Sequence, residues 1–160
     1  VESVRDIEKI ENIEIEKRSE NVKLLLNELR SNVLQLAGNK EIIISNDITV
    51  DKIQIDKGVF FRILENLLQN ALRYAEKQVS INLLHKKDFL ILTVKDDGKG
   101  FSAADLEKAT TVFYSNDKEK QHFGIGLSVC KILCEKHGGL LYVGNQKEKG
   151  ACVTAKLKNF

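Results

Sequence analysis

The order of helix-like and strand-like segments restricts the fold of this chain more than any other feature of its sequence. Three stretches with helical periodicity alternate with three pairs of short strand-like runs. Each amphipathic helix must bury its apolar face, and a sheet built from the paired runs supplies a surface on which it can pack. The pattern therefore predicts an α+β fold, a two-layer sandwich of one mixed sheet with three main helices on one face.

The bounds of these elements follow from hydrophobic periodicity and from residues that begin or end helices. Asp56 is placed to cap the second helix, and Gly38 ends the first. The run at 89–94 is apolar on both faces, which is typical of a central strand. The expected helices cover residues 19–38, 56–75 and 124–137, and the expected strands cover residues 42–44, 53–55, 79–84, 89–94, 140–143 and 151–157.

Composition excludes several classes of protein. The 160 residues suffice for one domain, with roughly 70% of the extended chain's surface buried on folding. The 25 Lys and Arg residues against 23 Asp and Glu give a net charge of +2, without the basic excess of a nucleic-acid-binding protein. No apolar run approaches the roughly 20 residues that span a bilayer, and three Cys without framework spacing favour a reducing compartment. We therefore expect a cytoplasmic domain with no nucleic-acid partner and no direct membrane contact.

The first 20 residues differ from the rest of the chain. They are rich in Glu, and their apolar residues repeat every three positions, a spacing that drifts around a helix instead of forming a stripe. The chain also starts with Val1, as a piece of a longer protein would. We therefore expect residues 1–20 to be the end of an upstream helix or a linker, and residues 21–160 to form the domain.

The second expected helix carries an unusual polar face. Its members are spaced i, i+4, i+7 and i+8, which places them on one side of the helix: Asn66, Asn70, Arg73 and Tyr74. Amide oxygens are suitable ligands for Mg²⁺, and a guanidinium group suits phosphate. The same pattern also fits an ordinary solvent-exposed face, so this helix alone leaves both interpretations open.

An acidic, glycine-containing loop follows the strand at 89–94. A carboxylate at a strand end can accept a hydrogen bond from an exocyclic amino group such as that of adenine. Two nearby glycines let a flat ring lie close to the backbone. Asp96, Gly98 and Gly100 are the residues placed for these roles.

Other interpretations of the same loop are an acidic turn or a cation site at Asp96 and Asp97. Residues 98–103 also match the glycine fingerprint of dinucleotide-binding proteins. That fingerprint requires a second parallel strand ending in an acidic residue, and residues 115–120 do not form one.

Glycines also mark the start of the third expected helix. Gly124 and Gly126 would leave backbone N–H groups free at a helix N-terminus, which is a ready site for phosphate. The alternative is a flexible hinge. Farther along, Cys130, Cys134 and His137 share one helix face, where ordinary core packing is favoured over a metal site because no fourth ligand accompanies them.

Taken in this order and spacing, these segments resemble the ATP-binding catalytic domain of sensor histidine kinases. The resemblance covers residues 42–160 and implies the Bergerat fold, with a mostly antiparallel sheet and a mobile ATP lid over residues 102–123. The matching motifs are the N box at 65–74, the first glycine box at 96–100, the F box at Phe113 and Tyr114, the second glycine box at 124–127, and a weak third glycine box at Gly150 and Ala151.

The resemblance implies ATP and Mg²⁺ as ligands. In that case Asn70 ligates Mg²⁺, with Asn66 supporting it directly or through a water, and Arg73 contacts phosphate. Tyr74 lies near the ribose or the base, and Asp96 accepts from the adenine amino group. The remaining implied nucleotide contacts are Gly98, Gly100, Phe101, Lys118, His122, Gly124, Ile125, Gly126 and Leu127.

The family transfers the γ-phosphoryl group of ATP to a histidine on a separate helical-hairpin domain. His85, His122 and His137 do not lie in an acidic helical context like that of the family's acceptor. The acceptor is therefore expected upstream, and residues 1–20 are expected to be the last turns of its hairpin or a linker. This chain alone is not expected to phosphorylate itself. The implied partners are the dimerisation and phosphotransfer domain and a response regulator, within a membrane-bound sensor.

Two other functions share these motifs: an anti-sigma-type serine kinase, and a non-catalytic nucleotide-gated interaction module in which ATP only orders the lid for a partner. Hydrolytic relatives such as gyrase place a Glu where this chain has Asn66, because hydrolysis needs a base that activates water. Glu65 stands about 100° away around the helix and is not placed to substitute. Efficient ATP hydrolysis is therefore not expected.

Overall fold

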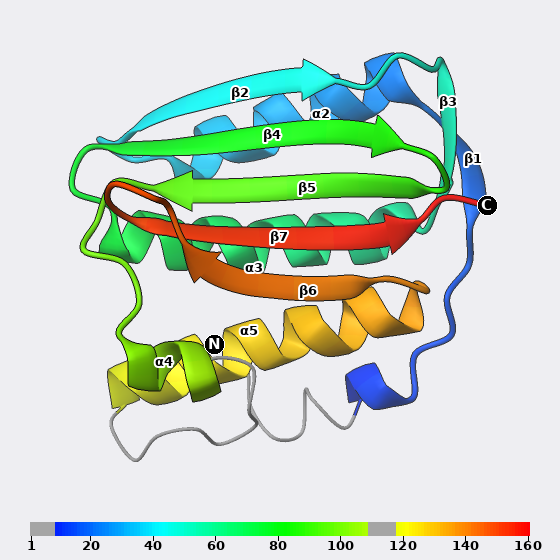
Figure 1. Cartoon of the computed structure of the whole chain (residues 1–160). Coiled ribbons are helices and arrows are strands. Elements are labelled where there is room, and N and C mark those ends of the chain that lie inside the picture. Colours follow the sequence, from blue (N-terminus) through cyan, green and yellow to red (C-terminus); the bar gives the residue numbers. More distant parts are fainter. Residues whose placement is uncertain (1–8, 109–117) are drawn as a thin grey trace.

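The computed structural model describes residues 9–108 and 118–160, with side chains throughout except at residues 118–125. Its main sheet has five strands in the order β2-β4-β5-β7-β6 (Figure 1). β2 and β4 are parallel, and the other neighbouring pairs are antiparallel. The strands are β2 (Glu41–Asp47), β4 (Gln78–Lys86), β5 (Phe89–Asp96), β6 (Leu140–Asn145) and β7 (Ala151–Lys158).

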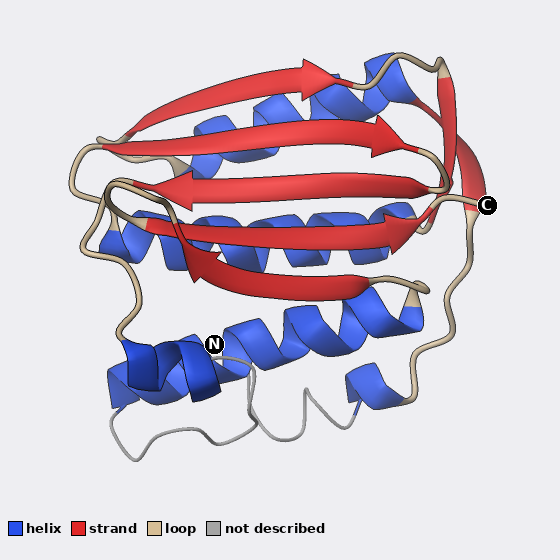
Figure 2. Ribbon diagram, in the orientation of Figure 1, coloured by secondary structure: helices blue, strands red, loops and turns tan. Residues whose placement is uncertain are grey.

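The long helices lie together on one face of this sheet (Figure 2). They are α2 (Val22–Leu36), α3 (Lys57–Tyr74) and α5 (Lys118–Lys136), and the short α4 (Ala103–Lys108) precedes α5. The expected two-layer α+β sandwich with a mixed, mostly antiparallel sheet is confirmed. Within the described ranges, no helix has both the length and the hydrophobicity needed to cross a membrane.

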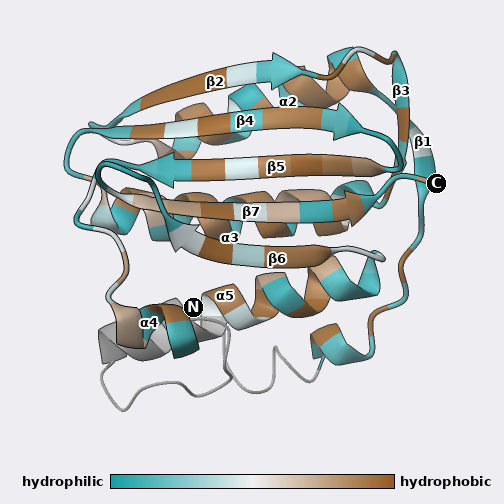
Figure 3. Cartoon of the chain, in the orientation of Figure 1, coloured by the Kyte–Doolittle hydropathy of each residue, from teal (hydrophilic) through white to brown (hydrophobic). Residues whose placement is uncertain are grey.

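The core lies between α3 and the sheet. Leu64 of α3 is completely buried, as is Leu83 of β4. β5 occupies the centre of the sheet, as its two apolar faces predict: Leu90 and Leu92 face the helices and are buried, whereas Ile91 is half-buried on the opposite face. Hydrophobic residues run along β4, β5 and β7 (Figure 3). α3 is therefore held on the sheet by its apolar side, with its polar side left for other contacts.

The start of the first helix and the grouping of the strands differ from expectation. α2 begins at Val22 rather than residue 19, because β1 (Arg18–Asn21) is extended. Asn21 caps the helix by accepting from the Leu24 N–H at 3.0 Å, and a capping residue has non-helical dihedrals. β1 pairs antiparallel with β3 (Lys52–Ile55), so β3 belongs to a separate two-stranded sheet and not to the main one.

α5 also begins earlier than expected, at Lys118 instead of residue 124. Residues 118–123 contain Lys, Glu and Gln, which favour helix and extend it beyond the glycines. Gly124 and Gly126 therefore lie within α5 and not at its N-terminus. Of the expected lid over residues 102–123, the structure describes α4 and the first residues of α5. Phe113 and Tyr114 lie outside the described residues.

The segment before β1 lies against the rest of the domain. Ile10 is buried, with 1% of its surface exposed. The Glu16 N–H donates to Oδ2 of Asp56 at 2.9 Å, and Oδ1 of the same carboxylate accepts from the Val59 N–H at 3.2 Å. Asp56 is thus the expected cap of α3, and it also holds the N-terminal segment. The division at residue 20 stays a prediction.

A buried histidine joins the end of α5 to the start of α3. His137 has no exposed surface, and its Nε2 accepts the Asp56 N–H at 3.0 Å, which requires that nitrogen to be unprotonated. Burial is the main cause that lowers the pKa of His137, and the charge of Lys17 lowers it further. Cys130 and Cys134 are buried on the same face, and no three metal-ligating residues are gathered anywhere in the described part of the chain. The burial of both thiols is what core packing predicts.

We expect the free energy of unfolding to decrease as the pH falls from about 7.5 to about 5.5. In this range the unfolded chain gains a proton at His137, whose ordinary pKa is 6.5, and the folded chain resists that protonation because its pKa is lowered. The unfolded state therefore binds more protons, and acid favours it. Urea unfolding at several pH values measures the effect.

The variant His137→Gln should unfold more easily at pH 7.5, by about 1–3 kcal/mol, and should lose most of this pH dependence. His85→Gln removes a different imidazole and serves as the control, which should keep the dependence. An equal pH dependence in His137→Gln and the unaltered chain would contradict the assignment.

Candidate functional site

The end of α3 and the loop after β5 meet backbone to backbone. A Cβ atom on Gly98 would lie 2.2 Å from the carbonyl oxygen of Tyr74, closer than any side chain can stand. Gly98 is therefore required by the protein's own packing, before any ligand is considered. The contact brings together two motifs that the sequence singled out, the polar face of α3 and the acidic loop at 96–100.

Asp97 ties these two segments together through hydrogen bonds to backbone N–H groups. Its Oδ1 accepts the Glu76 N–H at 2.8 Å, and both of its carboxylate oxygens accept the Lys77 N–H at 3.1 Å. Desolvation raises the pKa of Asp97, but the N–H groups of Lys77, Gln78 and Glu76 together outweigh it and hold the pKa below its usual value. Asp97 thus acts as a clamp between the chain after α3 and the end of β5.

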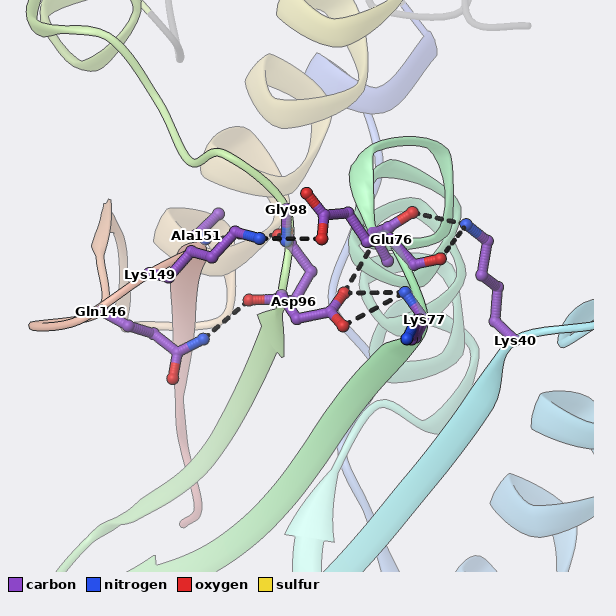
Figure 4. Close-up of polar contacts among 10 residues, drawn as sticks. Lys40, Glu76, Lys77, Asp96, Gly98, Gln146, Lys149 and Ala151 are labelled. Carbon is purple, nitrogen blue, oxygen red and sulfur yellow. Dashed lines mark hydrogen bonds and ion pairs between the residues drawn. The ribbon is translucent and has the colours of Figure 1, made fainter.

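Side chains around Glu76 add to this junction (Figure 4). The Lys40 ammonium donates to the carbonyl oxygens of Ala75 and Glu76. The Lys149 ammonium lies 2.8 Å from the Glu76 carboxylate, and both side chains are about half exposed. Such an exposed ion pair contributes little to stability. The carbonyl contacts and the Asp97 clamp therefore fix the residues that follow α3.

Asp96 points the other way and is buried, with 3% of its surface exposed. Its Oδ1 accepts the Gly98 N–H at 2.8 Å and the Ala151 N–H at 3.4 Å. Desolvation is the largest influence and raises the pKa of Asp96, against the lowering effect of these two N–H groups. Neither of these bonds uses Oδ2. The site therefore presents a buried carboxylate in a fixed orientation, an acceptor suited to an amino group on a flat ring.

The weak third glycine motif is brought to the same carboxylate. Gly150 has φ +96°, and a Cβ atom there would lie 1.8 Å from the Asp96 carbonyl oxygen. Only glycine fits this conformation and this approach. Gly150 thereby places the next residue, Ala151, so that its N–H reaches Asp96.

The polar face of α3 is only partly exposed. Asn66 and Asn70 are half-buried, Arg73 is exposed, and Tyr74 is half-buried and packs against the core. The Asn66 side-chain amide nitrogen donates to the Arg62 carbonyl at 3.1 Å, so its oxygen is the atom left to coordinate a cation. A fully solvated face would expose both asparagines, and the structure does not do so.

α5 lies beside α3, where the Cys130 thiol is 3.8 Å from the Ile63 carbonyl. In the second glycine motif, Leu127 is buried, and a Cβ atom on Gly126 would meet no atom of the described residues within 4 Å apart from its own helix backbone and chain neighbours. The remaining expected contacts on α5 lie among residues whose side chains are outside the described part: Lys118, His122, Gly124 and Ile125.

Sequence patterns missed three residues around Asp96. The sequence indicates only a turn or a cation site at Asp97, whereas its carboxylate binds backbone N–H groups in the structure. Asn145, the last residue of β6, binds Phe101 through its side-chain amide, and the next residue, Gln146, binds the Asp96 carbonyl at the end of β5. The local signal for them is two adjacent amide residues five and four positions before a glycine, which is too common to be diagnostic.

Comparison with known proteins identifies the family. The family described as histidine kinase-, DNA gyrase B- and HSP90-like ATPase matches residues 55–159. The chain belongs to this family. That range includes α3, the loop after β5 and α5, which are the elements that build the site.

Two relatives identify the kind of kinase. The chain is 36% identical over 152 residues to the sensor histidine kinase SpaK of Bacillus subtilis, which covers 91% of the chain and 33% of SpaK. It is 30% identical over 113 residues to the sensor histidine kinase WalK of Bacillus subtilis strain 168, covering 66% of the chain and 18% of WalK. The chain thus corresponds to the histidine kinase ATP-binding catalytic domain, and it spans a third or less of these relatives.

Solved structures show the same fold. The histidine kinase AdeS of Acinetobacter baumannii matches with a TM-score of 0.73 at 19% identity, over 97% of this chain and 74% of that one. The catalytic domain of histidine kinase ThkA matches with a TM-score of 0.73 at 22% identity, over 89% of this chain and 95% of that one. The expected Bergerat-type architecture of the kinase domain is therefore confirmed.

We expect Asp97→Asn to destabilise the kinase domain by about 1 kcal/mol at pH 7, because charge-assisted hydrogen bonds to backbone N–H groups become neutral ones. A carboxyl group with a lowered folded pKa stabilises the fold above its unfolded pKa, and this contribution is lost as the pH falls through the folded value. The difference between Asp97→Asn and the unaltered domain should therefore shrink towards pH 3. Urea unfolding at both pH values measures it.

Asp88→Asn, in the exposed turn between β4 and β5, serves as the matched control and should change stability little at either pH. A destabilisation of Asp97→Asn that stays the same from pH 7 to pH 3 would contradict the clamp.

Proposed function

We propose that this kinase domain binds ATP with Mg²⁺ between α3 and the loop after β5, and that it transfers the γ-phosphoryl group to a histidine on a separate helical domain. The observation that carries the proposal is the buried Asp96 carboxylate, held through Oδ1 by Gly98 and Ala151 beside the end of α3. Its remaining oxygen would accept from the exocyclic amino group of adenine. Guanine carries a carbonyl oxygen at that position and would be repelled.

A similar fold has been solved with a nucleotide analogue. Full-length ShkA in complex with AMPPNP matches with a TM-score of 0.75 at 22% identity, over 92% of this chain and 32% of that one. This supports an adenine nucleotide as the ligand class for the proposal. Tyr74, whose carbonyl oxygen lies against Gly98, would lie near the ring, together with Gly100 and Phe101 of the same loop.

Asn70, with Asn66 beside it, would hold Mg²⁺ through amide oxygens, and Arg73 would contact phosphate. Bound Mg²⁺ supplies charge neutralisation to the phosphates during transfer. The hydrogen bond from Asn66 to the Arg62 carbonyl turns the amide nitrogen toward its own helix. Lys118, His122 and residues 124–127 of α5 would complete the phosphate contacts.

Asn66 favours transfer over hydrolysis. An amide cannot take a proton from water, so the side chain in this position cannot act as a general base. A kinase instead aligns the phosphate with an acceptor that its partner supplies. The arrangement therefore fits phosphoryl transfer better than ATPase activity.

The acceptor histidine would lie on another domain. His137 is completely buried, and the half-buried His85 is paired with Asn159. We assign the acceptor to a dimerisation and phosphotransfer domain preceding residues 1–20, which would be the last turns of its hairpin or a linker. Residues 21–160 would be the catalytic domain. A response regulator would receive the phosphoryl group, and the whole protein would be a membrane-bound sensor with this domain in the cytoplasm.

Two experiments test the function. Calorimetric titration with ATP, ADP and NADH should show binding of adenine nucleotides that Mg²⁺ strengthens, and no binding of NADH. Mixing the domain with a histidine-containing helical hairpin of a sensor kinase and γ-labelled ATP should yield acid-labile phosphate on the hairpin. Acid-stable phosphoserine on a partner protein would favour a serine kinase instead. Binding of ATP without any transfer would favour a non-catalytic nucleotide-gated module.

We expect Asp96→Asn to weaken ATP binding roughly 10- to 100-fold, because it loses a charge-assisted hydrogen bond. The affinity of the unaltered domain should also decline on acidification at a higher pH than for an ordinary carboxyl group, since burial raises the pKa of Asp96. Asp88→Asn is the control and should bind as the unaltered domain does. An Asp96→Asn variant that binds ATP equally well would remove Asp96 from the adenine site.

We expect Asn70→Leu to abolish the strengthening of ATP binding by Mg²⁺, because leucine offers no oxygen ligand. Asn70→Asp keeps hard oxygen ligands and should preserve the Mg²⁺ dependence. Gln69→Leu, at an exposed neighbouring position of α3, is the matched control. If both Asn70 variants respond to Mg²⁺ as the unaltered domain does, the assignment of the metal ligand is wrong.

A further inference from the structure

The turn that joins β6 to β7 grips both ends of the loop after β5. At the start of the loop, the Gln146 side-chain nitrogen donates to the Asp96 carbonyl at 2.7 Å, and the Ala151 N–H donates to the Asp96 carboxylate at 3.4 Å. At the end of the loop, the Asn145 side chain binds the backbone of Phe101. We call Asn145, Gln146 and Ala151 the β6–β7 clasp. Figure 4 shows its contacts at Asp96.

Asn145 binds one residue through both of its amide atoms. Its Oδ1 accepts the Phe101 N–H at 2.8 Å, and its Nδ2 donates to the Phe101 carbonyl at 2.8 Å. Both bonds have the length of a good hydrogen bond. The pair requires a donor and an acceptor on one short side chain, which only asparagine supplies at this reach. The backbone of Phe101 is therefore fixed in position and in rotation.

Gly100 shows that the loop is shaped to admit this amide. It has φ +79°, and a Cβ atom there would lie 2.7 Å from Oδ1 of Asn145. The glycine thus has two reasons to be present that involve no ligand: its conformation and the space that Asn145 occupies. The same holds at the other end of the loop, where Gly150 makes room for the Asp96 carbonyl.

A backbone hydrogen bond closes the turn that carries the clasp. The Gln146 N–H donates to the Gly150 carbonyl at 2.8 Å, which shapes the turn between β6 and β7. β6 is an edge strand of the sheet, and β7 pairs with the central β5. The clasp therefore connects the edge of the sheet to the strand end that carries Asp96.

We propose that Asn145 is a positioning residue of the nucleotide site, which holds the loop from Asp96 to Phe101 in its binding shape before a nucleotide arrives. The inference rests on the proposed function, because it concerns the adenine end of that site. A loop that is already ordered loses less entropy on binding, so pre-ordering raises affinity. Asn145 also fixes the point from which the chain continues into α4, since Phe101 stands two residues before that helix.

A purely structural role predicts that removing the Asn145 side chain lowers the free energy of unfolding and leaves nucleotide affinity unchanged. Asn145 is exposed at the end of an edge strand and adds no apolar surface to the core, so its loss should change the free energy of unfolding little. A positioning role instead predicts weaker nucleotide binding with nearly unchanged stability. Asn82 provides the matched control, because its side-chain nitrogen also makes two hydrogen bonds on the sheet, to Ser45 and Asp47.

The test is calorimetric titration with ADP of the unaltered chain, Asn145→Ala, Asn145→Asp and Asn82→Ala, with urea unfolding of each. Asn145→Ala should bind ADP about fivefold to tenfold more weakly. Asn145→Asp keeps the acceptor for the Phe101 N–H but not the donor to its carbonyl, so its affinity should lie between. Asn82→Ala should bind as the unaltered chain does. Hydrogen exchange of the Phe101 amide, without nucleotide, should be faster in Asn145→Ala than in Asn82→Ala.

The outcomes separate this inference from the function beneath it. An unaltered chain that binds no ADP overturns the proposed function and the inference together. An unaltered chain that binds ADP, with Asn145→Ala binding equally tightly, overturns the inference alone. A fall in affinity matched by an equal loss in Asn82→Ala also overturns it, since the effect would then follow from general weakening of the sheet.

Discussion

The buried carboxylate of Asp96 is the constraint on which the rest of the site depends. A charged group removed from water is costly to the fold unless nearby donors replace its lost hydrogen bonds, and the N–H groups of Gly98 and Ala151 do so at Oδ1. Each donor comes close because a glycine stands where a side chain would collide, Gly98 against Tyr74 and Gly150 against Asp96 itself. Glycines in two motifs far apart in the sequence therefore allow the backbone to surround one buried charge.

α3 connects this site to the hydrophobic core. Its apolar side, including Leu64, is buried against the sheet, so the helix cannot shift without disturbing the core. Its first turn is held by Asp56, whose N–H binds His137 just after α5 and whose carboxylate also binds the N-terminal segment. Its far end lies against Gly98. The polar face that carries Asn70 is thus fixed at both ends of one helix.

Sequence patterns predicted the architecture because helices, strands and caps depend on residues that are close together in the sequence. Apolar spacing located α3 and β5, and an Asp before a helical run identified a real cap. The contacts that were missed are long-range: Asn145 binds a residue 44 positions away, and Asp97 binds Lys77, 20 positions away. A hydrogen bond from a side chain to distant backbone leaves no period in the sequence. The early start of α5 has another cause, because helix-forming residues precede the glycines and extend the helix beyond them.

The adjacent residues Asp96 and Asp97 show how a strand assigns opposite roles to the same side chain. Successive residues at the end of β5 point to opposite sides, so Asp96 enters the core layer and Asp97 faces the chain after α3. Burial raises the pKa of Asp96, and backbone N–H groups lower that of Asp97. A register shift of one residue in β5 would exchange these environments: the Asp97 carboxylate would be buried and the Asp96 carboxylate exposed. The two carboxylates therefore fix the register at which β5 must end, and with it the place of the glycines that follow.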